Sequence, residues 1–126
     1  MTTPLHRASC RGHTDAMQLL IDHGADVNVK DKWGRTPLHD ASYKGHIDAM
    51  ALLMNHGAEV NVKDTWNSTP LHNASEYGYT DAIQLLIDHG AEVNMKDKWG
   101  RTPLHYALYK SHVDVIASLR ENGAIE

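Results

Sequence analysis

The pattern of apolar and polar positions in residues 36–57 predicts two short helices of different character. In the first helix, Leu38, Ala41 and Ser42 share one side by their i, i+3, i+4 spacing, and polar residues fall on another side. The second helix is predicted to start near Asp48, and its apolar residues cover too much of its circumference for a helix with one wet side. We therefore expect neighbouring helices to cover it on two sides.

Local signals predict where these helices begin and end. Thr36 before Pro37 is typical of an N-cap followed by a first-turn proline, whose missing N–H costs nothing there. Gly45 is predicted to end the first helix and Gly57 the second. The segment that follows carries short β-like pieces around a turn centred on Asn67. Because asparagine and glycine tolerate a positive φ, this segment is predicted to form a β-hairpin.

The same pattern recurs along the chain with a period of 33 residues. Each copy contains the motif TPLH, and the stretch DKWGRTPLH occurs twice without change, at 31–39 and 97–105. A fixed period of this length is typical of repeat proteins, in which each unit buries its core against the next. We predict a single domain over residues 1–126, with repeats at 1–30, 31–63, 64–96 and 97–126.

This repeat resembles the ankyrin repeat, whose marker is TPLHxA at the same spacing. The motif stands here as TPLHRAS, TPLHDAS, TPLHNAS and TPLHYAL. The resemblance implies an all-α repeat solenoid, an ankyrin-type stack of antiparallel helix pairs joined by projecting β-hairpin loops. It also implies that each TPLH histidine hydrogen-bonds neighbouring backbone and braces the hairpin. In the family, the residues matching Asn28, Asn61 and Asn94 are positions that an oxygenase can hydroxylate.

The last copy departs from the pattern in its second helix. Ser118-Leu119 replaces the usual Leu-Leu pair and is followed by Arg120. Terminal repeats need a polar outer side, so residues 97–126 are predicted to form a C-terminal cap.

Composition narrows the classes of function. The formal net charge of −4 gives no reason to expect nucleic-acid affinity, and no apolar run approaches the ~20 residues of a membrane span. The lone cysteine cannot form an internal disulfide, which favours a reducing compartment and an intracellular, cytoplasmic location.

The ten histidines invite a metal-site or catalytic interpretation, which the periodicity argues against. Four of them end TPLH, three follow the turn between helices, and three precede the glycine that ends the second helix. A single catalytic or metal site needs a cluster that breaks the repeat, and no phosphate-binding glycine motif is present. We predict a non-enzymatic protein without a metal, a cofactor or a small-molecule substrate.

Function is expected at positions that the repeat leaves free and that still carry large or charged side chains. Two sets qualify, the hairpin tips and the free side of the first helices, which in the ankyrin family line the concave groove that binds partner proteins. The predicted partner-binding residues are Lys32, Trp33, Arg35, Tyr43, Lys44, Trp66, Tyr77, Lys98, Trp99, Arg101, Tyr106, Tyr109 and Lys110.

Charge also distinguishes this side of the molecule. Eleven of the twelve basic residues lie in the hairpins or first helices, against eight acidic residues there, whereas the second helices are acidic. An acidic or polar segment of a partner protein would be steered to such a surface.

The three tryptophans share one repeat position, at the hairpin tips. Each ring is predicted either to lie flat against the neighbouring hairpin or to serve as an anchor for a partner, and both roles are compatible. The near-identical copies also suit a second hypothesis, an engineered or consensus-like scaffold without a natural partner. Nucleic-acid binding ranks third, because the basic residues are interleaved with acidic ones.

Overall fold

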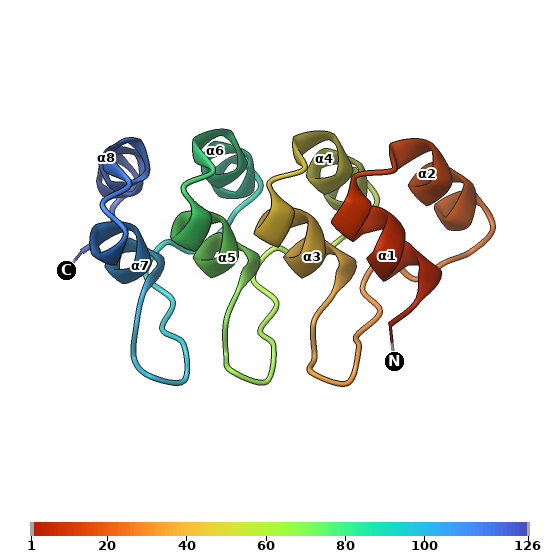
Figure 1. Cartoon of the computed structure of the whole chain (residues 1–126), viewed down its shortest axis with the longest axis horizontal. Coiled ribbons are helices and arrows are strands. Elements are labelled where there is room, and N and C mark those ends of the chain that lie inside the picture. Colours follow the sequence, from red (N-terminus) through yellow and green to blue (C-terminus); the bar gives the residue numbers. More distant parts are fainter. Residues whose placement is uncertain (1, 126) are drawn as a thin grey trace.

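The computed structural model describes residues 2–125, which form eight α-helices in two parallel rows (Figure 1). One row holds the first helix of each repeat and the other row holds the second, and each first helix packs against its own second helix and the next first helix. The stack is therefore the all-α solenoid that the family resemblance implies. The first row is α1 (Pro4–Arg11), α3 (Pro37–Lys44), α5 (Pro70–Tyr77) and α7 (Pro103–Tyr109), and the second is α2 (Thr14–Asp22), α4 (Ile47–Asn55), α6 (Thr80–Asp88) and α8 (Val113–Glu121).

The predicted helix ends are confirmed at α3. The Thr36 hydroxyl accepts a hydrogen bond from the backbone N–H of His39 at 3.4 Å, and Pro37 is the first helical residue. Gly45 ends the helix with φ 71°, a left-handed conformation that glycine adopts without a steric penalty. These local signals recur in α1 and α5, so the sequence positions the first row one repeat at a time.

The core lies between the two rows. In α4, the side chains of Ala49, Met50 and Leu53 are fully buried, and α4 contacts α3 in its own pair as well as α2 and α6 beside it. The expected cover on two sides of the second helix is thus confirmed. Among residues 2–125, no helix is both long and apolar enough to cross a membrane.

The connecting loops differ from the predicted β-hairpins, because residues 2–125 contain no β-strand. In the first loop, one backbone bond joins Asp31 N–H to the Arg35 carbonyl at 2.9 Å. The Asp31 carboxylate closes the turn by accepting the backbone N–H groups of Trp33 and Arg35, each at 2.9 Å. The Asp31 side chain therefore accepts backbone N–H groups that would bond to a second strand in a hairpin. We call these three loops, residues 31–35, 64–68 and 97–101, the tryptophan turns.

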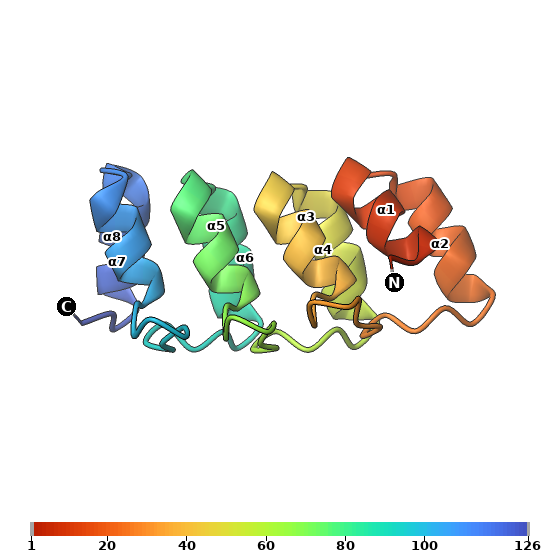
Figure 2. The same ribbon diagram turned by 60° about the horizontal axis from the view of Figure 1, so that its bottom comes forward.

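Successive tryptophan turns are bonded to one another. The Trp33 carbonyl accepts the backbone N–H of Thr65 at 2.9 Å, and the Trp66 carbonyl accepts that of Lys98 at 2.8 Å. The turns consequently project side by side from the first row of helices (Figure 2).

Three of the four TPLH histidines brace these turns, as the family resemblance implies, whereas the His105 ring makes no hydrogen bond within the described residues. Nε2 of His39 lies 2.9 Å from the Ser68 carbonyl in the next turn, and Nδ1 lies 3.1 Å from the Thr36 backbone N–H. Because a carbonyl only accepts, the ring carries its hydrogen on Nε2, which leaves Nδ1 as the acceptor. His6 and His72 repeat this arrangement, so each ring joins the start of its helix to the following repeat.

Acidification is expected to destabilise the fold through these buried rings. Burial lowers the pKa of His39 to about 4, and it moves the pKa of His72 in the same direction. An unfolded histidine has a pKa of about 6.5, so the unfolded chain binds the proton first, and the stability present above pH 6.5 is lost as the pH falls towards 4. From His39 alone, we expect the free energy of unfolding to fall by about 2 kcal/mol between pH 7 and pH 5.

Urea denaturation at pH 7, 6 and 5 measures this loss. The variant His39→Gln cannot titrate at this position, and its unfolding free energy should fall less steeply over the same range. A pH dependence as steep as that of the parent protein would contradict the assignment.

Asparagine side chains also join neighbouring repeats, in the segments that precede the tryptophan turns. Nδ2 of Asn28 donates to the Gly57 carbonyl at 3.1 Å, and its Oδ1 accepts the backbone N–H of Glu59 at 2.8 Å. Asn61 and Asn94 make the corresponding pairs of bonds one repeat further on. Each of these amides therefore satisfies both a donor and an acceptor of the next repeat.

Candidate functional site

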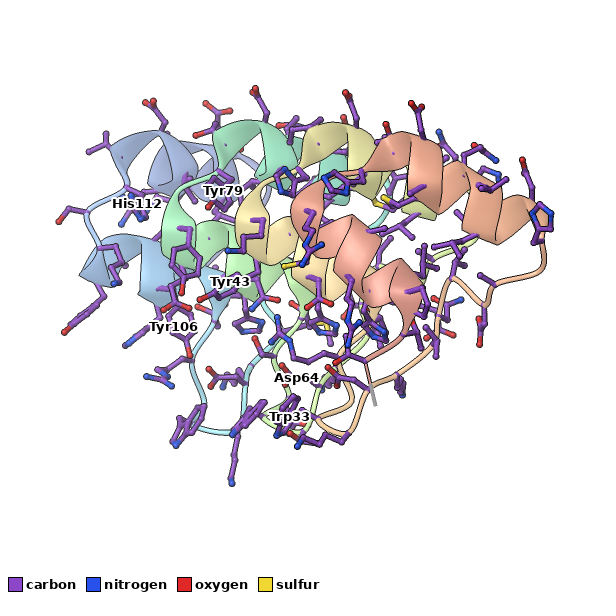
Figure 3. The ribbon with its side chains drawn as sticks, turned by 45° about the vertical axis from the view of Figure 1, so that its right-hand side comes forward. Trp33, Tyr43, Asp64, Tyr79, Tyr106 and His112 are labelled. Carbon is purple, nitrogen blue, oxygen red and sulfur yellow. The ribbon has the colours of Figure 1, made fainter. Side chains whose placement is uncertain are left out.

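The predicted site residues fall on one continuous part of the molecule. They lie in the tryptophan turns and on the row of first helices from which the turns project (Figure 1). In Figure 3, Trp33 lies at the end of its turn, whereas Tyr43 lies on the helix row above it. We call this surface, the three tryptophan turns together with the exposed side chains of α1, α3, α5 and α7, the loop face.

The tryptophan rings are half exposed. The exposed fractions are 43% for Trp33, 36% for Trp66 and 57% for Trp99. Their cover comes partly from cations of their own turns, because Lys32 Nζ lies 4.4 Å from the Trp33 ring centroid. The rings of Trp33 and Trp99 therefore have both an intramolecular cation contact and a surface open to solvent. Within residues 2–125 no tryptophan stacks on another aromatic ring.

Two of the predicted tyrosines meet across neighbouring repeats. The Tyr77 hydroxyl donates to the Tyr43 hydroxyl at 3.0 Å, and the two rings pack edge to face with centroids 4.7 Å apart. This hydrogen bond, together with partial burial, raises the pKa of Tyr77. Lys44 adds a cation 5.8 Å from the Tyr43 ring centroid, whereas Tyr109 is 79% exposed at the end of α7.

The fourth repeat holds an aromatic and charged cluster around Arg101. Its guanidinium lies 4.6 Å from the Trp99 ring centroid and 4.9 Å from that of Tyr106. The Tyr106 hydroxyl donates to the buried carboxylate of Asp97, whose Oδ2 also lies 3.5 Å from Arg101 Nε. Arg101 and Tyr106 are thus held in place inside the loop face rather than free at its surface.

Burial and hydrogen bonding have opposite effects on the pKa of Asp97 in this cluster. Burial alone raises the pKa of Asp97, but the Tyr106 hydroxyl and the backbone N–H groups of Arg101 and Trp99 outweigh it and hold that pKa below its usual value. Burial and the bond to Asp97 raise the pKa of Tyr106. The aspartate therefore stays ionised and the tyrosine stays protonated at neutral pH.

Arg35 is likewise engaged within the protein. Its Nε lies 3.7 Å from Asp40 Oδ1, and its Nη1 lies 3.4 Å from Asp64 Oδ2 in the next turn. Burial raises the pKa of Asp40, although the neighbouring Arg35 partly offsets the effect. Arg35 consequently links a turn, its helix and the following turn, which makes it a positioning residue more than an exposed contact.

In the structure, the acidic and basic side chains of the loop face differ in their exposure to solvent. The carboxylates of Asp31, Asp64 and Asp97 each accept two backbone N–H groups inside their turns, and Asp64 and Asp97 are buried. No acidic residue of the turns or first helices within residues 2–125 is fully exposed. The exposed charges there are all basic, namely Arg7, Arg11, Lys32, Lys44 and Lys98, and the exposed Lys110 directly follows α7. Three exposed acids, Asp26, Glu59 and Glu92, lie in the segments that lead into the turns.

This difference was missed by the charge count from sequence, which included the turn aspartates as surface charge. Their recurrence at the start of each turn, three residues before a glycine or asparagine, is typical of an aspartate that bonds backbone in a turn, and it is the signal that could have revealed them. The acids of the second helices, in contrast, are exposed: Asp15, Asp22, Asp48, Asp81, Asp88, Asp114 and Glu121.

Two hollows border this region. One of about 360 Å³ lies between α1 and the first tryptophan turn, and its lining includes Arg7, Arg11 and Trp33. The other, of about 400 Å³, lies at the outer side of α7, is lined in part by Leu104 and Leu108, and contains none of the predicted site residues. The first hollow is thus lined by two arginines of the loop face that the predicted list of partner-binding residues left out.

The described part of the chain offers no cluster of three or more His, Cys, Asp or Glu side chains arranged to hold a metal ion. Two of the three histidines that follow the inter-helix turns bond to backbone instead. Nε2 of His46 lies 3.0 Å from the Cys10 carbonyl, and Nε2 of His112 lies 2.9 Å from that of Glu76.

Comparison with known proteins gives matches along the whole stack. A family model described as ankyrin repeats (3 copies) matches residues 1–64 and 59–125. Curated relatives include an ankyrin repeat protein of vaccinia virus (strain Copenhagen), 53% identical over 34 residues, and an ankyrin repeat-containing protein of Schizosaccharomyces pombe, 41% identical over 34 residues. Serine/threonine-protein kinase 12 of Arabidopsis thaliana is 50% identical over 34 residues.

These relatives are much longer proteins. Each match covers 27% of this chain, but only 6% of the viral protein, 16% of the yeast protein and 7% of the kinase. The similarity is therefore one of single repeats, and the kinase resembles this chain only over that short stretch.

Proposed function

The chain belongs to the ankyrin-repeat family, and on that premise we propose that it is a non-enzymatic interaction module whose loop face binds a partner protein. Ankyrin repeats generally mediate protein–protein interaction. The finer assignment, to the tryptophan turns and the first helices, rests on the physical character of that surface.

The observation that carries the proposal is the row of half-exposed tryptophans on neighbouring turns. Trp33, Trp66 and Trp99 present large amphipathic rings on neighbouring turns that backbone hydrogen bonds join to one another. Tryptophan, tyrosine and arginine are the residues enriched in binding hot spots, where truncation costs about 2 kcal/mol or more. Such a row provides anchors that are already ordered in the folded protein, so binding loses less conformational entropy.

The exposed charges indicate the chemistry of the partner. The loop face and the adjoining Lys110 show six basic side chains to solvent. The exposed acids lie on the second helices, and three more, Asp26, Glu59 and Glu92, lie in the segments that lead into the turns. An acidic segment of a partner would be attracted to the loop face and repelled from the opposite side. We therefore assign the loop face to an acidic protein segment.

Replacing Trp66 with alanine tests the proposal at the middle turn. We expect the affinity for a partner captured by the intact protein to fall by about 2 kcal/mol, or roughly 30-fold, because a central anchor is lost. The measurement is isothermal titration with the purified partner after its identification from a pull-down.

Val113→Ala is the matched control, since it truncates an apolar side chain that is 73% exposed but lies at the start of α8. It should leave the affinity unchanged. Equal loss in both variants would contradict binding through the loop face, and the absence of any specific capture by the intact protein would favour the scaffold hypothesis.

A further inference from the structure

The spacing of the tryptophan turns matches one conformation of an extended chain. Neighbouring helices pack with their axes about 8–10 Å apart, so the tryptophans recur at about that interval along the stack. A polyproline II helix has three residues per turn and rises about 3.1 Å per residue, which places every third side chain on the same side at about 9.3 Å intervals. A β-strand alternates its side chains between two faces and cannot present every third residue to one surface.

The hydrogen-bonding groups of the turns favour the same conformation. The indole N–H groups of Trp33, Trp66 and Trp99 make no hydrogen bond within the described residues, and their rings are half exposed. An α-helical ligand uses its carbonyls internally, whereas a polyproline II segment leaves every carbonyl free to accept. Three donors in a row are therefore better matched to polyproline II than to a helix.

The charges of the turns indicate which residues a bound segment would carry between its apolar positions. Lys32 and Lys98 are exposed in the same turns as Trp33 and Trp99, while the aspartates of those turns point into them. The cations that cover Trp33 and Trp99 also occupy part of the ring surface on which a nucleic-acid base would stack. The loop face is thus better suited to a protein segment than to single-stranded nucleic acid.

Resting on the proposed function, we propose that the bound segment is an acidic polyproline II segment that lies along the stack. A proline or other apolar residue at every third position contacts the rings of Trp33, Trp66 and Trp99 in turn. Carboxylates between these positions pair with the exposed lysines, and backbone carbonyls accept the indole N–H groups.

A synthetic peptide of repeating Pro-Pro-Glu provides the probe. About 12 residues span about 37 Å in polyproline II, which is long enough to reach all three turns. Titrated into ¹⁵N-labelled protein, it should shift the three indole N–H resonances together and saturably. Its affinity should exceed that of a Gly-Gly-Glu peptide of equal length and charge by on the order of tenfold, because the proline chain is already ordered.

A charge test uses variants of equal net charge. Removing the two lysines in Lys32→Ala/Lys98→Ala should weaken binding of the Pro-Pro-Glu peptide by on the order of tenfold. The control Asn55→Asp/Gln84→Glu changes the net charge equally but on exposed positions of α4 and α6, and it should bind as the parent does. Equal weakening in both would contradict specific pairing at the turns.

The remaining outcomes separate this inference from the proposed function. If the Gly-Gly-Glu peptide or a helical acidic peptide shifts the same resonances as strongly, the loop face binds acidic protein segments but the polyproline II conformation is wrong. If the Pro-Pro-Glu peptide causes no shift, the inference is overturned, while the Trp66 comparison still decides the function. Tighter binding of single-stranded RNA than of every peptide would overturn both.

Discussion

Replacing His39 with alanine is expected to lower the free energy of unfolding by about 4 kcal/mol, a large share of the stability of a domain this size. The ring is fully buried and bonds to the Thr36 backbone N–H and to the Ser68 carbonyl of the next repeat. Its removal leaves those buried groups without partners, at about 1–3 kcal/mol each, and adds a cavity between two repeats. Urea denaturation monitored by circular dichroism measures the loss.

His105→Ala is the control that isolates this brace. His105 occupies the same motif position in the fourth repeat, but its side chain is exposed and its ring makes no hydrogen bond within the described residues. We expect its replacement to cost less than about 1 kcal/mol. Similar losses in the two variants would show that the bond to the following turn is not what makes His39 important.

Replacing Gly45 with alanine is expected to cost about 3 kcal/mol and to weaken the coupling between the second and third repeats. The added Cβ would lie 2.8 Å from Cδ1 of Tyr79, and the residue would have to keep its φ of 71°. The left-handed conformation costs an L-residue about 1–2 kcal/mol, and crowding at a packed junction adds about 1–3 kcal/mol. Chemical denaturation should show a lower midpoint and a broader transition.

Gly57→Ala separates the two contributions. Gly57 has φ 90°, but nothing lies within 4 Å of its ideal Cβ position, so only the conformational cost of about 1–2 kcal/mol should remain. Adding Tyr79→Ala to Gly45→Ala should relieve part of the crowding, which a double-mutant cycle would report as coupling. Equal losses for the two glycines and no coupling to Tyr79 would contradict the steric explanation.

The fourth repeat illustrates the same constraint. Ser111 stands where the other repeats have Gly12, Gly45 and Gly78, and it adopts φ 60°. At each of those glycines, a Cβ would come within 2.8 Å of a ring in the following repeat. No helix pair packs on the outer side of α7 and α8 within residues 2–125, so the serine meets no such ring.

The loops show why the predicted strands were wrong. Short alternating pieces such as the one ending at Asn61 have a β-like pattern, but strands require a ladder of backbone partners. Here the Asn61 amide bonds to Gly90 and Glu92 of the next repeat, and the Asp64 carboxylate closes the turn. Side chains thereby take bonds that a hairpin would make between two strands.

The sequence predicted most of the candidate residues that lie on the loop face, but it left out Arg7 and Arg11 and did not predict the contacts that these residues make. Sequence periodicity identified the tryptophan and tyrosine positions, because these large side chains occupy repeat positions that lie outside the predicted core. It could not indicate that Arg35 and Arg101 are held by carboxylates, or that Tyr43 and Tyr77 bond to each other. Those contacts join residues from different elements, and they depend on how one repeat is placed against the next.

The sequence by itself determined the repeat, the helix ends and the identity of the first row, because a threonine cap, a first-turn proline and a left-handed glycine act on the backbone within a few residues. Only the tertiary structure decided which charges face solvent. Asp64 is buried beneath its own turn and beside Arg35 of the preceding repeat, whereas Lys32 and Lys98 remain exposed. Burial depends on neighbours about one repeat away, so the basic character of the loop face arises only when the repeats stack.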